Sequence, residues 1–310
     1  YEEILLTQQA LLQTCLSQYE ANPALYTTPI AMDDLIEVRT TLGYRDINLY
    51  GISYGTRAAL VYLRRHESSV RSVILDSVVP MSMKVGEMVA VDAQASFQML
   101  LADCQSQAHC AEAFPALEQH FNELLGRLKA QSEDVTIVHP RTGEFISGKV
   151  TQNHVTQMLR GILYDRDLSS LVPLAIEEAY LGNYQPLVTS NFVFSGGDDN
   201  EGSGMSIGMM ASVLCSEDLS LVSAPGQAKH FDNPMFRSLK PVCEFWPTRG
   251  IPLDYFEPVS SDKPVLLLSG KFDPITPPKY GWQAAATLSN SEHVVVPGVG
   301  HAASLRGCVP

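Results

Sequence analysis

The chain has 310 residues, of which 45% are hydrophobic and 18% are charged, and its formal net charge is −13. This composition is typical of a globular protein with a sizeable core and excludes a disordered chain. The negative charge argues against nucleic acid or an anionic membrane surface as a partner, and no apolar run approaches the roughly 20 residues of a membrane-spanning helix.

The cysteines are the first clue to the compartment of the protein. They number six, and none has the spacing of a zinc site: positions 15, 104, 110, 215, 243 and 308. An even number of scattered cysteines favours disulfides, and therefore a secreted or periplasmic protein. Cys104 could pair with Cys110, and Cys215 with Cys243. The alternative is six buried thiols in a cytosolic protein. No signal peptide is visible, because the sequence begins at Tyr1 without a methionine.

The first part of the chain alternates helices and strands. Apolar residues recur at helical spacing over 1–21, and a second helix is expected from about 28 to 42, with Gly43 as its stop. Apolar runs at 47–50 and 70–75 have the character of buried strands. Strand, helix and strand in succession predict a parallel sheet.

A glycine-rich turn follows the strand at 47–50 and precedes a helical pattern over 56–63. Its sequence is Gly51-Ile52-Ser53-Tyr54-Gly55, a GxSxG motif in a strand–turn–helix setting. Such a nucleophile elbow holds the serine in a strained conformation above the sheet edge, and its glycines let strand and helix approach closely. The N–H of Tyr54 then points to where an oxyanion forms in acyl transfer. A plain glycine-rich turn is the alternative, but the setting favours an elbow with Ser53 as nucleophile.

The pattern changes from about Met83 to long helical stretches, interrupted near 136–150 by a segment typical of a β-hairpin. A glycine- and acid-rich stretch at 195–202 matches neither a phosphate loop nor a calcium loop and is interpreted as a solvated loop. Strand patterns return at 263–270 and 293–298.

The simplest architecture is an α/β fold, with a mainly parallel sheet flanked by helices and an inserted, mainly helical cap. The expected domains are a first part of the core at 1–82, the cap insertion at 83–255 and a second part of the core at 256–310.

A serine hydroxyl is a weak nucleophile and needs a histidine base held by a carboxylate. In α/β-hydrolases these residues follow the order Ser, Asp or Glu, His, each on a loop after a strand. Asp273 and His301 stand at such positions in this chain. Asp273 could instead cap a helix, and Asp76, which also ends a strand, is the rival acid. A triad of Ser53, Asp273 and His301 requires no cofactor and no metal.

These motifs resemble the prolyl iminopeptidase and tripeptidyl aminopeptidase family of α/β-hydrolases. The serine and histidine motifs are shared by many hydrolases, whereas Ser-Tyr-Gly-Thr at 53–56 together with Cys-Ser-Glu-Asp at 215–218 is more particular to this branch. The segments that carry the resemblance span nearly the whole chain: 26–28, 33–35, 38–39, 42–44, 51–56, 215–218, 270–277 and 300–301.

The resemblance implies an α/β-hydrolase fold with a helical cap inserted after the sixth strand, and removal of residues from the free amino terminus of peptides. Acidic cap residues of the family are thought to receive the ammonium of the substrate. Glu217, and less directly Asp218, match that substrate-binding role by motif position, and an ammonium partner would select chain ends. The alternative is that both residues cap a helix or form salt bridges within the cap.

The chain departs from the family at both ends. The glycine-rich oxyanion loop of the family, of the type His/Asn-Gly-Gly-Pro-Gly, lies upstream of the first helix and has no counterpart here. The sequence also stops soon after His301, where the family continues into a closing helix. We therefore expect an internal fragment of a longer hydrolase.

Three functions are compatible with these residues. The leading hypothesis is a serine peptidase that acts on peptides with a free amino terminus, outside the cytoplasm. The second is an esterase or lipase-like acyl hydrolase on the same triad, because one fold hosts many chemistries. The third is a non-catalytic binding protein on the hydrolase fold; its usual sign is loss of a triad member, and here all three positions are filled. The released peptide, any proline preference and the oligomeric state are not predicted.

Overall fold

A computed structural model describes residues 2–195 and 206–306 of the chain. Two features of the sequence lie wholly or largely outside the described residues. They are the glycine- and acid-rich stretch at 195–202, of which only Ser195 is described, and Cys308.

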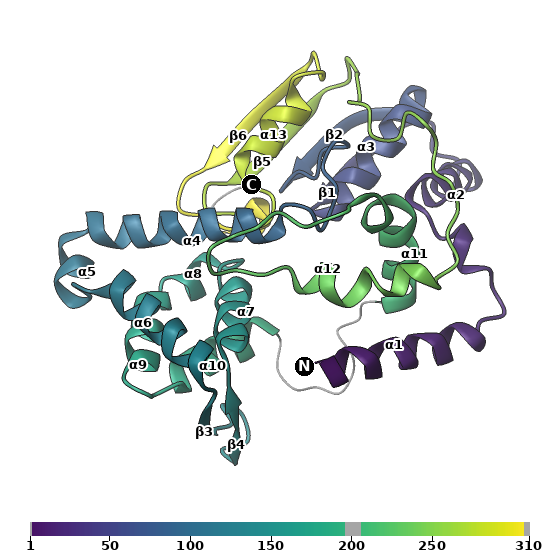
Figure 1. Cartoon of the computed structure of the whole chain (residues 1–310). Helices are drawn as coiled ribbons and strands as arrows, with labels where there is room; N and C mark the ends of the chain where they lie inside the picture. Colours follow the sequence, from purple (N-terminus) through teal and green to yellow (C-terminus); the bar gives the residue numbers. More distant parts are fainter. Residues whose placement is uncertain (1, 196–205, 307–310) are drawn as a thin grey trace.

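A sheet of four parallel strands forms the centre of the fold (Figure 1). In spatial order the strands are β1 (Ile47–Ile52), β2 (Val70–Asp76), β5 (Val265–Gly270) and β6 (Ser291–Val296). β2 and β5 pair directly, although the whole insertion lies between them in sequence. Because all strands run in one direction, their carboxyl ends meet at one edge, which is where open α/β sheets bind ligands.

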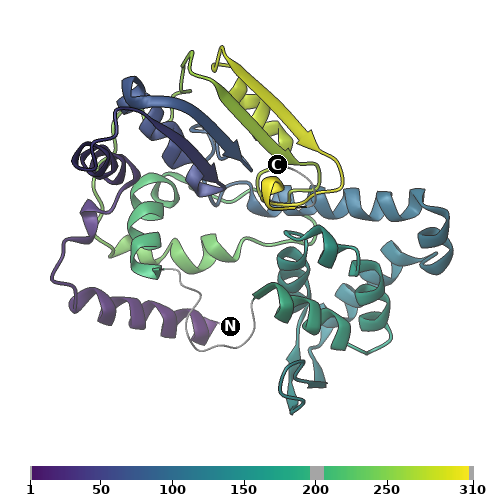
Figure 2. The same ribbon diagram turned by 180° about the vertical axis from the view of Figure 1, so that it is seen from behind.

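Helices that alternate with these strands cover the sheet (Figures 1 and 2). They are α2 (Thr28–Thr41), α3 (Tyr54–His66) and α13 (Pro278–Ala285). The apolar stripe of α3 contributes Leu60 and Leu63 to a core shared with Leu75 of β2 and Leu267 of β5, and all four side chains are buried. The expected α/β fold with a parallel sheet is confirmed.

The chain between β2 and β5 is mainly helical and faces the carboxyl ends of the strands (Figure 2). Its described residues include an antiparallel hairpin, β3 (Glu133–Val138) with β4 (Phe145–Val150), which confirms the hairpin expected near 136–150. The helices of this insertion are α4 (Val89–Ser106), α5 (Ala108–Ala113), α6 (Leu117–Ala130), α7 (Gln152–Ile162), α8 (Arg166–Ser169), α9 (Val172–Tyr180), α10 (Gln185–Ser195), α11 (Ile207–Glu217) and α12 (Pro234–Leu239).

The insertion has two apolar cores. One joins α4, α6, α7 and α9 around Phe97, Phe121 and Leu159. The other joins α11 to the short helices η3 (Leu219–Leu221) and η4 (Val242–Glu244), and α1 (Glu2–Ser17) contributes Leu12 and Leu16 to it. The boundaries of the insertion at residues 83 and 255 remain predictions. None of the described helices combines the length and the apolar character needed to cross a membrane.

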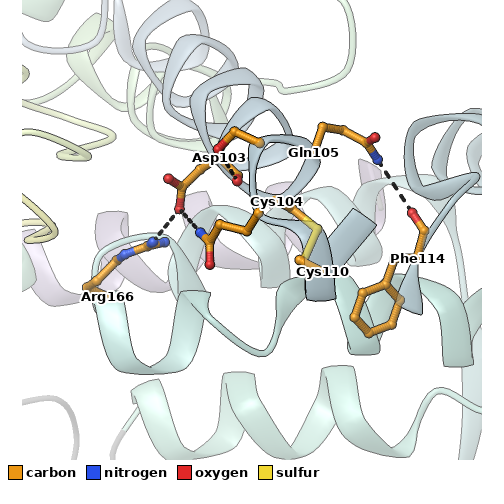
Figure 3. Close-up of a disulfide and its surroundings, with 8 residues drawn as sticks. Asp103, Cys104, Gln105, Cys110, Phe114 and Arg166 are labelled. Carbon is orange, nitrogen blue, oxygen red and sulfur yellow. Dashed lines mark hydrogen bonds and ion pairs between the residues drawn. A yellow bond between two sulfur atoms is a disulfide. The ribbon is translucent and has the colours of Figure 1, made fainter. Parts of the chain in front are cut away.

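Each core of the insertion contains or adjoins a disulfide. Cys104–Cys110 joins α4 to α5, and Cys215–Cys243 joins α11 to η4. Figure 3 shows the first of them beside the Asp103–Arg166 ion pair, which connects α4 to α8. The two pairings suggested by the sequence are therefore present, and within the described part of the chain Cys15 is free and exposed.

The close approach of β1 and α3 depends on one glycine of the elbow. A Cβ at Gly51 would overlap the carbonyl of Gly55 and the amide of Thr56, whereas a Cβ at Gly55 would meet no described atom within 4 Å. The expectation that both glycines permit the approach is therefore correct for Gly51 and wrong for Gly55.

This difference gives a test of the fold. Gly51→Ala should lower the free energy of unfolding by about 2–3 kcal/mol, because the added methyl group meets backbone that cannot move aside. Gly55→Ala is the matched control and should leave stability nearly unchanged. Urea unfolding monitored by circular dichroism measures both, and equal losses in the two variants would contradict the assignment.

Candidate active site

Ser53 lies at the turn between β1 and α3, and its backbone has φ 55° and ψ −124°. A non-glycine residue with positive φ is strained and persists only where neighbouring contacts hold it. Here the Ser53 N–H donates to the carbonyl of Asp76 over 2.9 Å, and the Thr56 N–H donates to the carbonyl of Ser53 over 2.9 Å. Tyr54 is the first residue of α3, so its N–H has no intrahelical acceptor.

Asp273 and His301 come together from the loops that follow β5 and β6. His301 Nδ1 and Asp273 Oδ2 are 2.8 Å apart. The Asp273 side chain is fully buried, and its Oδ1 also accepts from the N–H groups of Ile275 at 2.9 Å and Thr276 at 2.8 Å. Asp273 therefore has both geometries that the sequence left open, since it caps the turn after β5 and holds the histidine.

The pair shifts the pKa values of both partners. Burial raises the cost of a charge on Asp273, but the His301 ring and the N–H donors hold the pKa of Asp273 below its ordinary value. Burial likewise disfavours the imidazolium, yet the Asp273 carboxylate raises the pKa of His301 above its ordinary value. A carboxylate at Nδ1 keeps the proton of the neutral ring on that nitrogen and leaves Nε2 as the basic position.

Asp76 fixes the loop that carries His301. Its buried carboxylate accepts from the N–H of Ala303 at 2.9 Å, from the N–H of Ser304 at 2.8 Å and from the Ser304 hydroxyl. The adjacent Ser77 Oγ accepts from the N–H of Ala302 at 2.8 Å. Among the described hydrogen bonds Asp76 has none to His301, so the geometry favours Asp273 over this rival as the acid of the triad.

Backbone strain is concentrated at this point of the fold. The non-glycine residues with positive φ in the described chain are Ser53, Ser77 and Ala302, at 55°, 59° and 62°. The Ser53 N–H is bonded to the carbonyl of Asp76, which precedes Ser77, and the Ala302 N–H is bonded to the hydroxyl of Ser77. Strained residues cluster at functional sites, where the surrounding contacts over-determine them.

A cavity of about 500 Å³ opens beside His301. Its wall combines apolar side chains from α8 and α10 of the insertion with residues of the histidine loop. The lining residues are Tyr164, Asp165, Asp167, Leu168, Val193, Phe194, His301, Ala302 and Arg306. The His301 N–H also donates to the carbonyl of Tyr164 over 3.0 Å, so the insertion itself holds the histidine loop.

Glu217 and Asp218 lie at the end of α11 and have partners within the protein. Glu217 Oε1 accepts from the Thr28 N–H over 2.5 Å, and Glu217 Oε2 accepts from the hydroxyls of Thr28, at 2.7 Å, and Tyr255. Asp218 forms an ion pair with Arg57 at 2.8 Å, and both side chains are buried. These contacts correspond to the alternative that the sequence left open, in which the two carboxylates are satisfied internally.

Sequence reasoning missed the residues that hold this site together. The bonds from Asp76 and Ser77 to the histidine loop, and from Thr28 and Arg57 to the end of α11, were not predicted. The position of Asp76 at a strand end was a signal of importance, but it does not reveal the partner. No cluster of three or more His, Cys, Asp or Glu side chains suited to a metal ion is found in residues 2–195 and 206–306.

The positions of Asp273 and Asp76 predict how each carboxylate affects the pKa of His301. We expect Asp273→Asn to lower the pKa of His301, because the charge that stabilises the imidazolium is lost while burial remains. Asp76→Asn should lower it less, because Asp76 contributes only at longer range. Histidine ring signals in NMR titrations of the three proteins measure the effect. An equal or larger change in Asp76→Asn would make Asp76 the partner of the histidine.

Comparison with known proteins gives two family matches. Residues 17–110 match the family described as alpha/beta hydrolase fold, and residues 228–309 match the family described as TAP-like protein. The second match covers Asp273 and His301, and the first covers Ser53. The search of curated proteins found no match.

Comparison with solved structures also gives matches, among them the following three. The α/β-hydrolase MGS-M2 from a deep-sea metagenome library has 16% identity and a TM-score of 0.34, over 92% of this chain and 68% of its own. A thermophilic esterase from Thermogutta terrifontis has 15% identity and a TM-score of 0.36, over 90% and 66%. Carboxylesterase CesB from Bacillus subtilis has 15% identity and a TM-score of 0.34, over 91% and 62%.

The sheet, the insertion and the two family matches agree on one assignment. The chain has the α/β-hydrolase fold, and its C-terminal part matches the TAP-like family.

Proposed function

We propose that this protein is a serine peptidase that hydrolyses peptides from a free amino terminus through an acyl-enzyme on Ser53. The observation that carries the proposal is the His301–Asp273 pair, which a chain of contacts through Asp76 and Ser77 joins to the strained Ser53. The TAP-like match over residues 228–309 supports a peptide as substrate.

The mechanism follows from the roles that this geometry allows. Ser53 Oγ attacks the carbonyl carbon of the scissile bond while His301 Nε2 takes the Oγ proton, and the tetrahedral oxyanion faces the Tyr54 N–H. Asp273 stabilises the imidazolium, which then protonates the leaving amine. A water molecule then attacks the acyl carbon while His301 removes its proton. The acyl–Ser53 bond breaks, the acid product leaves, and His301 returns the proton to Ser53 Oγ.

The cavity beside His301 is where we propose that the substrate binds. Leu168, Val193 and Phe194 suit apolar side chains of a short peptide, and Asp167 is exposed at the same wall. The volume of about 500 Å³ falls in the range of small-ligand sites. The two disulfides support an oxidising compartment outside the cytoplasm as the place of action.

The test is hydrolysis of a fluorogenic Ala-Ala-Pro amide by the full-length protein, first with a free amino terminus and then succinylated. We expect turnover of the free peptide only, and a loss of about 10³-fold or more in kcat for Ser53→Ala, because the nucleophile is removed. Turnover should also fall as the pH drops through the raised pKa of His301, since the protonated ring is no base.

The same experiment separates the other functions. Turnover of a p-nitrophenyl ester without either peptide would make the protein an esterase. Peptide hydrolysis that survives Ser53→Ala would remove Ser53 as the nucleophile. Equal turnover of free and succinylated peptides would remove the requirement for a free amino terminus.

A further inference from the structure

A continuous chain of hydrogen bonds runs from the elbow to a buried carboxylate of the insertion. Tyr54 Oη and Thr28 Oγ1 are 2.6 Å apart, and Thr28 Oγ1 is 2.7 Å from Glu217 Oε2. Tyr255 also donates its hydroxyl to Glu217 Oε2. The chain connects α3, α2, α11 and the loop before β5, which are far apart in sequence.

The direction of this chain follows from its chemistry. The Thr28 N–H is only a donor, so Glu217 Oε1 must accept from it. When Glu217 is a carboxylate, Oε2 also accepts, and the Thr28 hydroxyl donates its only proton to Oε2. The Tyr54 hydroxyl must then donate to Thr28. Burial, opposed by the Thr28 contact, raises the pKa of Tyr54 to about 12, which keeps the tyrosine protonated for that role.

Glu217 has no exposed surface, and its two oxygens have these three donors. A buried carboxylate is tolerated when it is hydrogen-bonded, and removing a donor then costs free energy because a polar group is left unpaired. The hydrogen bonds that link Glu217 through Thr28 to Tyr54 therefore resist rearrangement. The Cys215–Cys243 disulfide fixes the end of α11 two residues before Glu217.

Asp218, the residue after Glu217, makes a second connection between the end of α11 and α3. Asp218 pairs with Arg57, which lies one turn further along α3, and also accepts from the Val85 N–H over 2.8 Å. Consecutive carboxylates at the end of α11 thus reach the first two turns of the helix that begins at the elbow, one directly and one through Thr28. An ammonium of a substrate would have to displace Thr28 or Tyr255 from Glu217, or Arg57 from Asp218.

We propose that Glu217 is a positioning residue for the oxyanion donor: through Thr28 it holds Tyr54, whose N–H faces the developing oxyanion. This inference rests on the proposed acyl transfer at Ser53, but not on the identity of the substrate. Tyr54 belongs to the peptide unit that joins it to Ser53, so a fixed side chain limits rotation of that N–H. Preorganised donors of this kind stabilise the transition state without lowering the energy of the bound substrate.

The experiment interrupts the chain at each of its links in the full-length protein. The variants are Glu217→Gln, Thr28→Val and Tyr54→Phe, each of nearly unchanged shape, with Thr28→Ser as the conservative variant that keeps the hydroxyl. Ser212→Ala is the matched control, because it removes another buried hydrogen bond of α11, from Trp246 Nε1 to Ser212 Oγ at 2.9 Å, that has no connection to Tyr54. Substrates are a p-nitrophenyl ester, the free Ala-Ala-Pro amide and its succinylated form.

We expect each of the three interrupting variants to lower kcat about tenfold with KM nearly unchanged, since loss of a whole oxyanion donor costs about 10²–10³-fold and here the donor is only loosened. The double variant Glu217→Gln/Tyr54→Phe should lose no more than the worse single variant. Thr28→Ser should retain most of the wild-type kcat, and Ser212→Ala should lower the melting temperature without lowering kcat. A trifluoromethyl ketone inhibitor, whose adduct carries an oxyanion, should bind more weakly in proportion to the lost kcat.

Other outcomes overturn the proposal in distinct ways. A raised KM for the free peptide alone in Glu217→Gln, with the ester unaffected, would make Glu217 an ammonium-binding residue. Losses that multiply in the double variant would mean that Glu217 and Tyr54 act independently. Ester turnover with neither peptide cleaved would defeat the peptidase function and leave the ester results to decide the positioning role. Absence of turnover of all three probes by the wild-type protein would defeat both.

Discussion

The carboxyl end of β2 is the point on which the candidate site depends. The Asp76 carbonyl holds the N–H of Ser53, the Asp76 carboxylate holds the N–H groups of Ala303 and Ser304, and the Ser77 hydroxyl holds the N–H of Ala302. β2 pairs with β1 on one side and with β5 on the other. β2 lies between β1, which precedes Ser53, and β5, which precedes Asp273. It can therefore set the separation of the Ser53 and His301 loops through bonds to their backbone alone.

The insertion contacts the loops of the candidate site directly and helps to hold them in place. The Tyr164 carbonyl accepts from the His301 N–H, and a Cβ at Gly300 would crowd the same carbonyl. On the other side of the site the end of α11 contacts α3 through Arg57 and, by way of Thr28, Tyr54. Both the histidine and the elbow thus have partners in the insertion. Motion of these elements would change the geometry of the reacting groups as well as access to the cavity.

The sequence was sufficient for features that are set locally. Ser53, Asp273 and His301 were predicted to lie at one edge of the sheet because each follows an apolar run that forms a strand, and strand ends in a parallel sheet meet at one edge. The partners of Asp76 could not be predicted from the sequence, because its bond to Ala303 joins residues 227 positions apart. Glu217 was recognised by its motif, but its contact with Thr28 spans 189 positions and depends on how α11 meets α2. The GxSxG pattern likewise treats its glycines alike, whereas only Gly51 meets backbone.

The buried carboxylates explain how a strained site can be kept in one geometry. Asp76, Asp273, Glu217 and Asp218 each have almost no exposed surface, and such groups are tolerated only when donors surround them. Among those donors are backbone N–H groups of the loops and helix starts that form the site, at Ala303, Ser304, Thr276 and Thr28. Loosening any of these segments would remove a hydrogen bond from a carboxyl group in the interior. The free-energy cost of losing such a bond opposes relaxation of the backbone at Ser53, Ser77 and Ala302. The bonds that stabilise the buried carboxyl groups therefore also hold the strained backbone in place.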